Sequence, residues 1–183
     1  MELTAIMYHD DLVEKCKQGS SLSFKELYGQ YVKAMYNTCL RIVNNAADAE
    51  DIVQEAFIDA FRNIEGFNYK STFGAWMKRI VINKSINYLR DKKLKLVDIS
   101  QSNISELENE EEIDEERIQF KVAEIKNAVS MLPDGYRAVF TLNAFEGYDY
   151  DEIAEILKIS STTARTQYFR AKKQLLFFIK RKL

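Results

Sequence analysis

A block of acidic side chains near the middle of the chain limits how this sequence can fold. Eight carboxylate residues fall within eleven positions: Glu106, Glu108, Glu110, Glu111, Glu112, Asp114, Glu115 and Glu116. A polar run at residues 100–103 precedes them, and neither stretch shows an apolar periodicity. Such a block repels itself and cannot be buried in a core. We therefore expect two folded domains, residues 1–93 and 121–183, joined by an acidic flexible linker at residues 94–120.

The net charge of −2 hides an uneven distribution along the chain. Residues 1–93 carry a net charge of +1, residues 94–120 carry −7, and residues 121–183 carry +4. The whole-chain value alone would argue against a nucleic-acid-binding protein, which usually has a basic surplus. Because the acidity lies in the linker, the two expected domains remain compatible with binding DNA.

The scarcity of turn-forming residues favours an all-α fold. One Pro and six Gly among 183 residues leave too few tight turns for a β-sandwich or a β-barrel. Apolar side chains recur every three or four residues, which is the period of an amphipathic helix. This pattern covers residues 24–39, 48–61, 73–90, 118–132 and 136–145, with a loop at residues 67–72.

The last part of the chain has the outline of a helix-turn-helix. Asp149 followed by Glu152 forms a capping box that starts one helix. A short break at residues 158–160 leads to a final helix, for which Ser160 is the expected N-cap. Two helices joined by three or four residues, the second strongly basic, predict this DNA-binding motif.

Several other chemistries are excluded. A zinc site would need a cluster of ligands, but the chain has one histidine, His9, and two distant cysteines, Cys16 and Cys39. There is no nucleophile–histidine–acid set and no glycine-rich phosphate loop, so we expect neither an enzyme nor a bound cofactor. The N-terminus lacks the features of a signal peptide, and the apolar runs fall short of the ~20 residues that span a membrane. We expect a cytoplasmic protein without membrane insertion.

The final helix is the first candidate binding surface. Residues 161–183 contain seven basic side chains and no acidic one. Small hydroxyl residues in its first turn allow close approach to DNA, Arg and Gln can read base edges, and the later cations can meet phosphates. The candidate contacts are Ser161, Thr162, Arg165, Thr166, Gln167, Arg170, Lys172 and Lys173. The alternative is a basic helix that only faces solvent.

Residues 67–90 form a second candidate surface, because aromatic residues alternate with five basic ones and no acidic residue occurs. Single-stranded nucleic acid requires aromatic planes for its bases and cations for its backbone. The candidate contacts are Asn68, Tyr69, Lys70, Lys78, Arg79, Asn83, Lys84 and Asn87. The alternative is that the aromatic residues form a helical core, and for Trp76 and Ile80 we favour this alternative.

The helix at residues 48–61 has the opposite charge. Asp51, Gln54 and Glu55 share one helix face through their three- and four-residue spacing. An acidic patch on a DNA-binding domain suits a protein partner, although a solvated helix face would show the same pattern.

In this order, the segments resemble an RNA polymerase sigma factor of the extracytoplasmic-function (ECF) group over residues 11–179. Residues 48–57 are similar to the helix that binds core polymerase. Residues 67–88, with Phe73, Trp76, Arg79, Ile80, Asn83 and Asn87, resemble the regions that melt and read the −10 promoter element. Leu132-Pro133, Tyr136-Arg137, Phe140, Glu146-Gly147-Tyr148, Glu152-Ile153-Ala154, Ile159-Ser160 and residues 165–173 resemble the region that binds the −35 element.

This resemblance implies partners and roles for the candidate residues. Core RNA polymerase would be bound through its β′ coiled coil and its β flap, with Asp51, Gln54 and Glu55 on the β′ side. Promoter DNA would be read at −10 by the 67–90 set and at −35 by the 161–173 set. An anti-sigma factor, often membrane-bound in this family, would regulate the protein. Residues 161–164 and Gln167 depart from the family pattern, so a promoter sequence cannot be transferred.

The sequence thus predicts a two-domain transcription initiation factor that catalyses no reaction. A conventional helix-turn-helix regulator that binds duplex DNA as a dimer would explain only the C-terminal domain. An adaptor that binds proteins alone would explain the charged faces but not the helix-turn-helix. A nuclease or recombinase is disfavoured because no catalytic set of residues is present.

Overall fold

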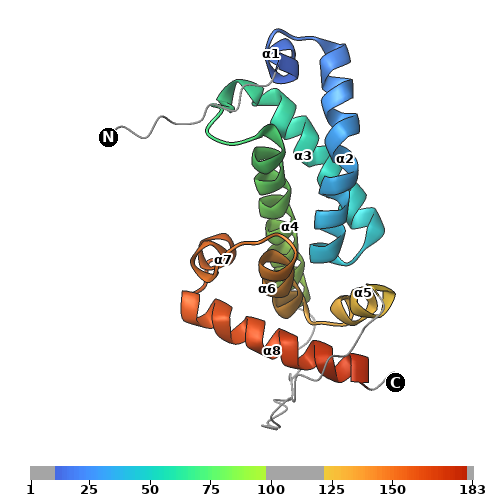
Figure 1. Cartoon of the computed structure of the whole chain (residues 1–183), viewed down its shortest axis with the longest axis vertical. Coiled ribbons are helices and arrows are strands. Elements are labelled where there is room, and N and C mark those ends of the chain that lie inside the picture. The colour runs from blue at the N-terminus through green and yellow to red at the C-terminus, as the bar shows by residue number, and fades with distance from the viewer. Residues whose placement is uncertain (1–10, 98–121, 181–183) are drawn as a thin grey trace.

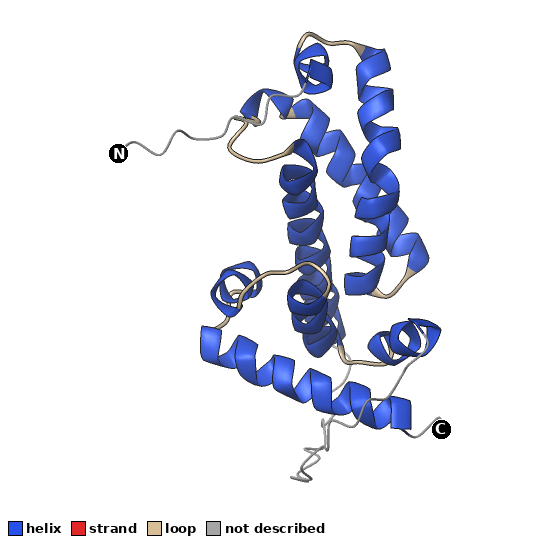
Figure 2. Ribbon diagram, viewed as in Figure 1, coloured by secondary structure: helices blue, strands red, loops and turns tan. Residues whose placement is uncertain are grey.

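The structure is a computed structural model, and it describes residues 11–97 and 122–180. Within these two ranges the chain forms α-helices and one short 3₁₀ helix, and no strand occurs (Figure 2). The elements are α1 (Asp11–Lys17), α2 (Ser21–Val43), α3 (Ala46–Arg62), η1 (Ile64–Gly66), α4 (Phe73–Val97), α5 (Val122–Ser130), α6 (Asp134–Ala144), α7 (Tyr150–Leu157) and α8 (Ser161–Lys180). The predicted all-α fold class is confirmed.

Local capping explains where the two long helices of the N-terminal half meet. Ser20 caps α2 by accepting a hydrogen bond from the backbone N–H of Ser23 at 3.4 Å. The helix ends at Asn44, whose φ of 58° lies in the left-handed region that asparagine tolerates. Asn45 then caps α3 by accepting from the backbone N–H of Asp48 at 3.0 Å. The chain therefore reverses direction within two residues, and α3 packs back along α2.

The core of the N-terminal half lies between α2, α3 and α4. Leu27, Cys39, Phe57 and Met77 are almost completely buried there. Trp76, one of the residues for which we favoured a core role, is half-buried and packs against this core together with Ile80. The helix stripes read from the sequence therefore do bury a common face.

The C-terminal half contains the predicted helix-turn-helix in α7 and α8. Asp149 accepts from the backbone N–H of Glu152 at 2.8 Å, and the Glu152 carboxylate accepts from the backbone N–H of Asp149 at 2.9 Å. This is the predicted capping box. α7 ends at Lys158, with φ 56°, and Ser160 caps α8 by accepting from the backbone N–H of Thr163 at 3.0 Å. Both predicted caps are confirmed.

The two halves pack against each other rather than standing apart. In Figure 1, α6 lies beside the lower end of α2, α7 lies beside the lower part of α4, and α8 crosses beneath them. Val139 and Leu142 of α6 and Ile153 of α7 belong to the same buried cluster as the core of α2–α4. A smaller cluster joins α5, α6 and α8 through residues that include Leu132 and Leu175.

The element bounds differ from the sequence-based expectation in two places. α1 was not expected, because a helix of seven residues is too short to show a periodicity. α4 extends to Val97, beyond the predicted domain boundary at residue 93. The acidic block at residues 106–116 and most of the predicted linker lie outside the described residues, so the domain boundaries remain a prediction.

Candidate nucleic-acid interface

One side of α8 presents a continuous exposed surface. Small and apolar residues anchor the opposite side in the core: Ala164, Ala171, Leu175 and Ile179. Most of the predicted contacts are exposed on the outer side: Thr162, Arg165, Thr166, Arg170, Lys172 and Lys173. The described part of α8 contains no acidic residue. This arrangement gives a helix face of one charge sign with hydroxyl groups at its start, which suits the major groove of duplex DNA.

Arg165 is held at the start of this face by an aromatic ring. Its guanidinium carbon lies 5.4 Å from the ring centroid of Tyr150, the first residue of α7. Tyr150 in turn packs edge-on against Tyr168, with 5.9 Å between the ring centroids. The cation–π contact restricts an otherwise flexible side chain, so Arg165 is pre-positioned at the surface.

Two of the predicted contacts of α8 are half-buried, unlike the others. Gln167 is half-buried beside Gly135 at the start of α6, because its helix position turns it away from the exposed face. Ser161 is also half-buried. Sequence reasoning missed Phe169, whose side chain is 73% exposed on the outer face. An exposed ring among cations can contact the methyl group of thymine, and its signal in the sequence is its four-residue spacing from Arg165.

The loop at residues 67–72 is anchored to α1, and this changes the interpretation of Tyr69. The Tyr69 hydroxyl donates to the Glu14 carboxylate, the residue is only 8% exposed, and the Lys17 ammonium lies 4.3 Å from the centroid of its ring. The Lys17 ammonium also donates to the carbonyl of Phe67 at 3.0 Å. Tyr69 therefore holds the loop in place, and little of its surface is accessible to a base in this arrangement. Asn68 remains exposed.

The outer face of α4 carries the other polar residues of this set. Arg79, Asn83 and Asn87 follow one another at four-residue spacing, and all three are exposed. Lys70 is exposed in the preceding loop. The Asn87 side-chain oxygen accepts from Arg90 at 3.1 Å, which fixes the orientation of its amide. The structure thus brings amide and cationic groups together along one side of α4.

Two predicted lysines lie on other sides of α4. The Lys84 ammonium is 2.7 Å from the Asp59 carboxylate and 3.6 Å from that of Glu55, so it connects α4 to α3. This hydrogen bond and the charge of Lys84 lower the pKa of Asp59. The Lys78 ammonium is 2.9 Å from the carboxylate of Glu146, which belongs to the C-terminal half. Neither lysine shares the exposed face of Arg79 and Asn83.

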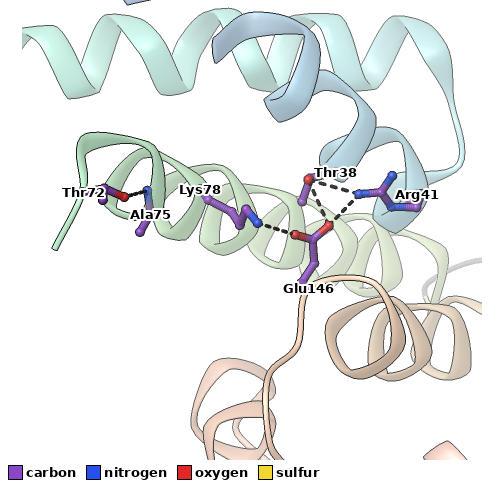
Figure 3. Close-up of polar contacts among 6 residues, drawn as sticks. All are labelled: Thr38, Arg41, Thr72, Ala75, Lys78 and Glu146. Carbon is purple, nitrogen blue, oxygen red and sulfur yellow. Dashed lines mark hydrogen bonds and ion pairs between the residues drawn. The ribbon is translucent and has the colours of Figure 1, made fainter. Parts of the chain in front are cut away.

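Glu146 is the centre of a polar cluster that sequence reasoning missed (Figure 3). Its side chain is only 2% exposed, and it accepts from Arg41 at 2.6 Å and from the Thr38 hydroxyl at 3.0 Å. Burial alone would raise the pKa of Glu146, but the hydrogen bonds from Lys78, Arg41 and Thr38 outweigh burial and lower it. The carboxylate is therefore ionised at neutral pH.

The outer face of α3 has a different character. Asp51, Gln54 and Glu55 are exposed together, as predicted from their spacing. Ile58, one helical turn from Gln54, is 50% exposed on the same side. A groove between α2 and α3 runs beside them, lined by Tyr28, Val32, Lys33, Tyr36, Glu50, Val53 and Gln54. An apolar groove and an exposed Ile within an acidic rim have the composition of a protein-binding surface.

The described ranges contain neither a metal-binding cluster nor a membrane-spanning helix. No three His, Cys, Asp or Glu side chains there are grouped so that they could hold a metal ion. None of the described helices combines the length and apolar character needed to cross a membrane.

Comparison with known families matches both halves of the chain. Residues 27–94 match the family model of sigma-70 region 2, and residues 123–175 match that of sigma-70 region 4. These two segments contain the candidate surfaces on α3, on α4 and on α8.

Curated relatives match along most of their length. The chain is 30% identical to the RNA polymerase sigma-H factor of Pseudomonas aeruginosa, over 90% of each chain. It is 31% identical to the ECF RNA polymerase sigma factor SigW of Bacillus subtilis, over 89% of this chain and 92% of that one. It is 32% identical to the ECF RNA polymerase sigma-E factor of Haemophilus influenzae, over 90% of this chain and 91% of that one.

Solved structures share the fold at lower identity. The sigma factor RpoE of Bartonella quintana, solved with the anti-sigma factor NepR, matches with a TM-score of 0.58 and 21% identity over 86% of this chain and 96% of that one. CnrH, solved with the cytosolic domain of CnrY, matches with a TM-score of 0.56 and 20% identity over 94% of this chain and 97% of that one.

Proposed function

The chain belongs to the ECF-type RNA polymerase sigma factors, and we propose that each of its three exposed surfaces binds a different partner during transcription initiation. As a member of this family, the protein binds core RNA polymerase and directs it to promoters. The observation that supports this proposal is that the three surfaces differ in chemistry. The surface is basic on α8, amide-rich and cationic on α4, and acidic with apolar residues on α3.

The outer face of α8 binds the −35 element as duplex DNA. Arg165 reads a base edge, Thr162 and Thr166 permit close approach, and Phe169 contacts a thymine methyl group. Arg170, Lys172 and Lys173 contact phosphates and set the register of the helix in the groove. Gln167 assists only if its half-buried side chain rotates outward.

The loop at residues 67–72 and the outer face of α4 bind the −10 element as single strands. Asn68, Asn83 and Asn87 supply amide groups for unpaired bases, while Lys70 and Arg79 neutralise the backbone. Lys78 and Lys84 contribute only after leaving their carboxylate partners.

The acidic face of α3 and the neighbouring groove dock the β′ coiled coil of core polymerase, while the β flap meets the C-terminal half. Each DNA-binding surface binds DNA only weakly on its own, since neither domain has a large positive charge. Polymerase makes binding tight by holding both surfaces at a fixed separation, which raises their effective concentration on the promoter.

The protein has no enzymatic activity of its own in this proposal, and it acts in the cytoplasm. An anti-sigma factor regulates it, by analogy with RpoE of Bartonella quintana, which shares the fold and was solved with the anti-sigma factor NepR. A conventional helix-turn-helix regulator is not favoured, because a sigma-70 family model also matches the N-terminal half.

Gln54→Lys tests the polymerase surface. The substitution places a cation in the middle of the acidic rim, so we expect the affinity for core polymerase to fall about tenfold or more. Gln30→Lys, which makes the same change at an exposed position of α2, is the matched control and should bind normally. The measurement is co-purification of each variant with core polymerase at several concentrations. Equal binding of both variants would refute the assignment of this surface.

A further inference from the structure

The backbone at Tyr69 adopts a conformation that a large side chain rarely takes. Its φ angle is 59°, in the left-handed region, where the Cβ atom of an ordinary residue crowds the backbone. Asn44 and Lys158 are the other described non-glycine residues with positive φ, and each of them ends a helix, where this conformation is common. Tyr69 lies inside a loop instead, so contacts with its surroundings must hold this conformation.

Two residues of α1 supply most of these contacts. The Tyr69 hydroxyl donates to the Glu14 carboxylate, and the Lys17 ammonium lies 4.3 Å from the centroid of the Tyr69 ring. The Phe67 ring meets the Tyr69 ring edge-on, with 4.8 Å between the two centroids. Lys17 also donates to the Phe67 carbonyl at 3.0 Å, so it fixes the residue against which the Tyr69 ring packs. We call Glu14, Lys17 and Tyr69 the α1 clamp.

The contacts of the α1 clamp are largely shielded from water. Tyr69 is 8% exposed, and the side chain of Lys17 is only 16% exposed although it carries a charge. Water weakens an ion pair or a ring contact at the open surface, but a partly desolvated cation depends on its protein partners. The α1 clamp therefore restrains the loop more strongly than the same contacts would in open solvent.

The buried position of Tyr69 leaves its two neighbours in the chain at the surface. Asn68 and Lys70 are both exposed, whereas the side chain between them turns toward α1. The Asn68 amide oxygen accepts a hydrogen bond from the backbone N–H of Lys70 at 3.3 Å, which spans the left-handed residue. Because this bond uses the amide oxygen, Asn68 offers its amide NH2 group as a donor to an acceptor atom of a base.

The other end of the loop is fixed as well. The Thr72 hydroxyl oxygen accepts from the backbone N–H of Ala75 at 3.2 Å, at the start of α4 (Figure 3). A Cβ atom on Gly74 would lie only 2.7 Å from the ring of Tyr31, so α2 and α4 approach closely at this point. The short segment between Tyr69 and Thr72 is therefore held at both ends.

A loop that is held in one shape discriminates among bases more sharply than a mobile loop does. Binding to a mobile loop must first restrict its backbone and side chains, which costs free energy. A mobile loop can also rearrange to accept a different base. A fixed Asn68 amide donor bonds only those bases that place an acceptor atom opposite it, while Lys70 meets the neighbouring phosphate.

We propose that Tyr69 is a positioning residue for −10 recognition, and that the α1 clamp sets the base preference of the loop by fixing Asn68 and Lys70. In this arrangement α1 belongs to the −10 surface, because it determines the shape of the loop that meets the base. The inference rests on the proposed function for the nature of the ligand. The restraint on the loop can be measured on the free protein.

Selection from a random pool measures the base preference of the loop. Core RNA polymerase reconstituted with the full chain selects among duplex DNA fragments with a randomised central segment, and the retained fragments are sequenced. Tyr69→Gly removes the ring and the hydroxyl but adopts the left-handed backbone without strain. We expect the preference for the best base over the worst to fall about tenfold at the −10 position that the loop reads. The −35 preference should stay unchanged, which a general loss of folded protein would not allow.

Glu14→Ala tests the α1 clamp from the side of α1. It removes the acceptor of the Tyr69 hydroxyl and leaves the loop sequence intact, so we expect the same −10 preference to fall about threefold. Glu26→Ala, which removes an exposed carboxylate of α2 and changes the net charge equally, is the matched control and should select as the unmodified protein does. Circular dichroism checks that the variants fold. Glu14→Ala serves alone if Tyr69→Gly does not fold, because alanine is compatible with a helix.

Hydrogen exchange of the free chain measures the restraint on the loop without DNA or polymerase. We expect the backbone amides of residues 68–71 to exchange about tenfold faster in Tyr69→Gly than in the unmodified protein, and faster in Glu14→Ala than in Glu26→Ala. The amides of α3 should exchange equally in all of them.

The outcomes separate this inference from the proposed function. The inference is overturned if the clamp variants keep the −10 preference, if they weaken the −10 and −35 preferences alike, or if their loop amides exchange as in the unmodified protein. In these cases the unmodified protein still directs polymerase to fragments that share two elements, so the proposed function stands. If polymerase with the unmodified protein selects no common sequence, the proposed function fails, and the inference fails with it.

Discussion

Arg165 offers a sharp prediction about how the −35 surface works. A bidentate contact between Arg and a base contributes about 1–3 kcal/mol to discrimination against the wrong base. An unrestrained Arg would lose much of its rotamer entropy, about 2 kcal/mol, in forming that contact. The Tyr150 ring, 5.4 Å from the guanidinium, already restricts Arg165 in the free protein. We therefore expect Arg165→Ala to cost about 2 kcal/mol, or roughly 30-fold in affinity.

The cation–π contact with Arg165 also sets how much a substitution of Tyr150 should weaken promoter binding. An exposed cation–π contact contributes about 0.5–1 kcal/mol, so Tyr150→Leu should weaken promoter binding by roughly 2- to 5-fold. Because Tyr150 acts through Arg165, the double variant should bind no more weakly than Arg165→Ala alone. Tyr150 also packs against Tyr168, so thermal melting of Tyr150→Leu separates lost positioning from lost stability.

The assay is competition binding of the reconstituted polymerase to a promoter and to variants that change one base pair of the −35 element. Arg165→Ala should abolish the preference at one position and leave the others intact. Lys126→Ala, at an exposed lysine of α5, is the control and should behave normally. A uniform loss over all sequences would make Arg165 a phosphate contact. Additive losses in the double variant would refute the positioning role of Tyr150.

Substitution or labelling of three further residues tests the same surfaces and core. Lys173→Ala should weaken binding to all promoters alike and make the slope of log affinity against log salt shallower by about 0.9; a change in sequence preference would contradict the phosphate assignment. Burial raises the pKa of Cys39 to about 11, so native Cys39 should resist alkylation at pH 8, and peptide mapping after labelling measures this. The unfolded thiol ionises at lower pH than the native one, so Cys39 should reduce stability as pH rises from about 9 to 11; urea unfolding of the Cys39→Ala variant should lack this component. Leu142→Ala should destabilise the fold by about 2–5 kcal/mol, because the side chain is fully buried; a smaller loss in urea unfolding would contradict the packing of α6 into the core of α2–α4.

Features set by nearby residues could be predicted from the sequence. The capping box of Asp149 and Glu152 and the Ser160 cap depend on groups three residues apart, and both occur in the structure. The exposed face of α8 follows from helical spacing alone. α1 escaped prediction because seven residues carry too little periodicity.

Features set by distant residues could not be predicted. The partners of Glu146 lie 105 and 108 positions away at Arg41 and Thr38, and no local pattern links them. The burial of Tyr69 depends on α1, and the direction of Lys84 depends on Asp59 of α3. Charge and residue type place these side chains in a candidate set, but only the packing of helices decides which of them face outward.

Transcription from a library of genomic fragments, using core RNA polymerase reconstituted with this protein, tests the central claim most directly. We expect transcripts whose upstream sequences share two short elements about 25 base pairs apart, and we expect their yield to fall with Arg165→Ala. Core polymerase alone should not produce them. Transcripts that are the same with and without the protein would contradict its assignment as the factor that selects the promoter.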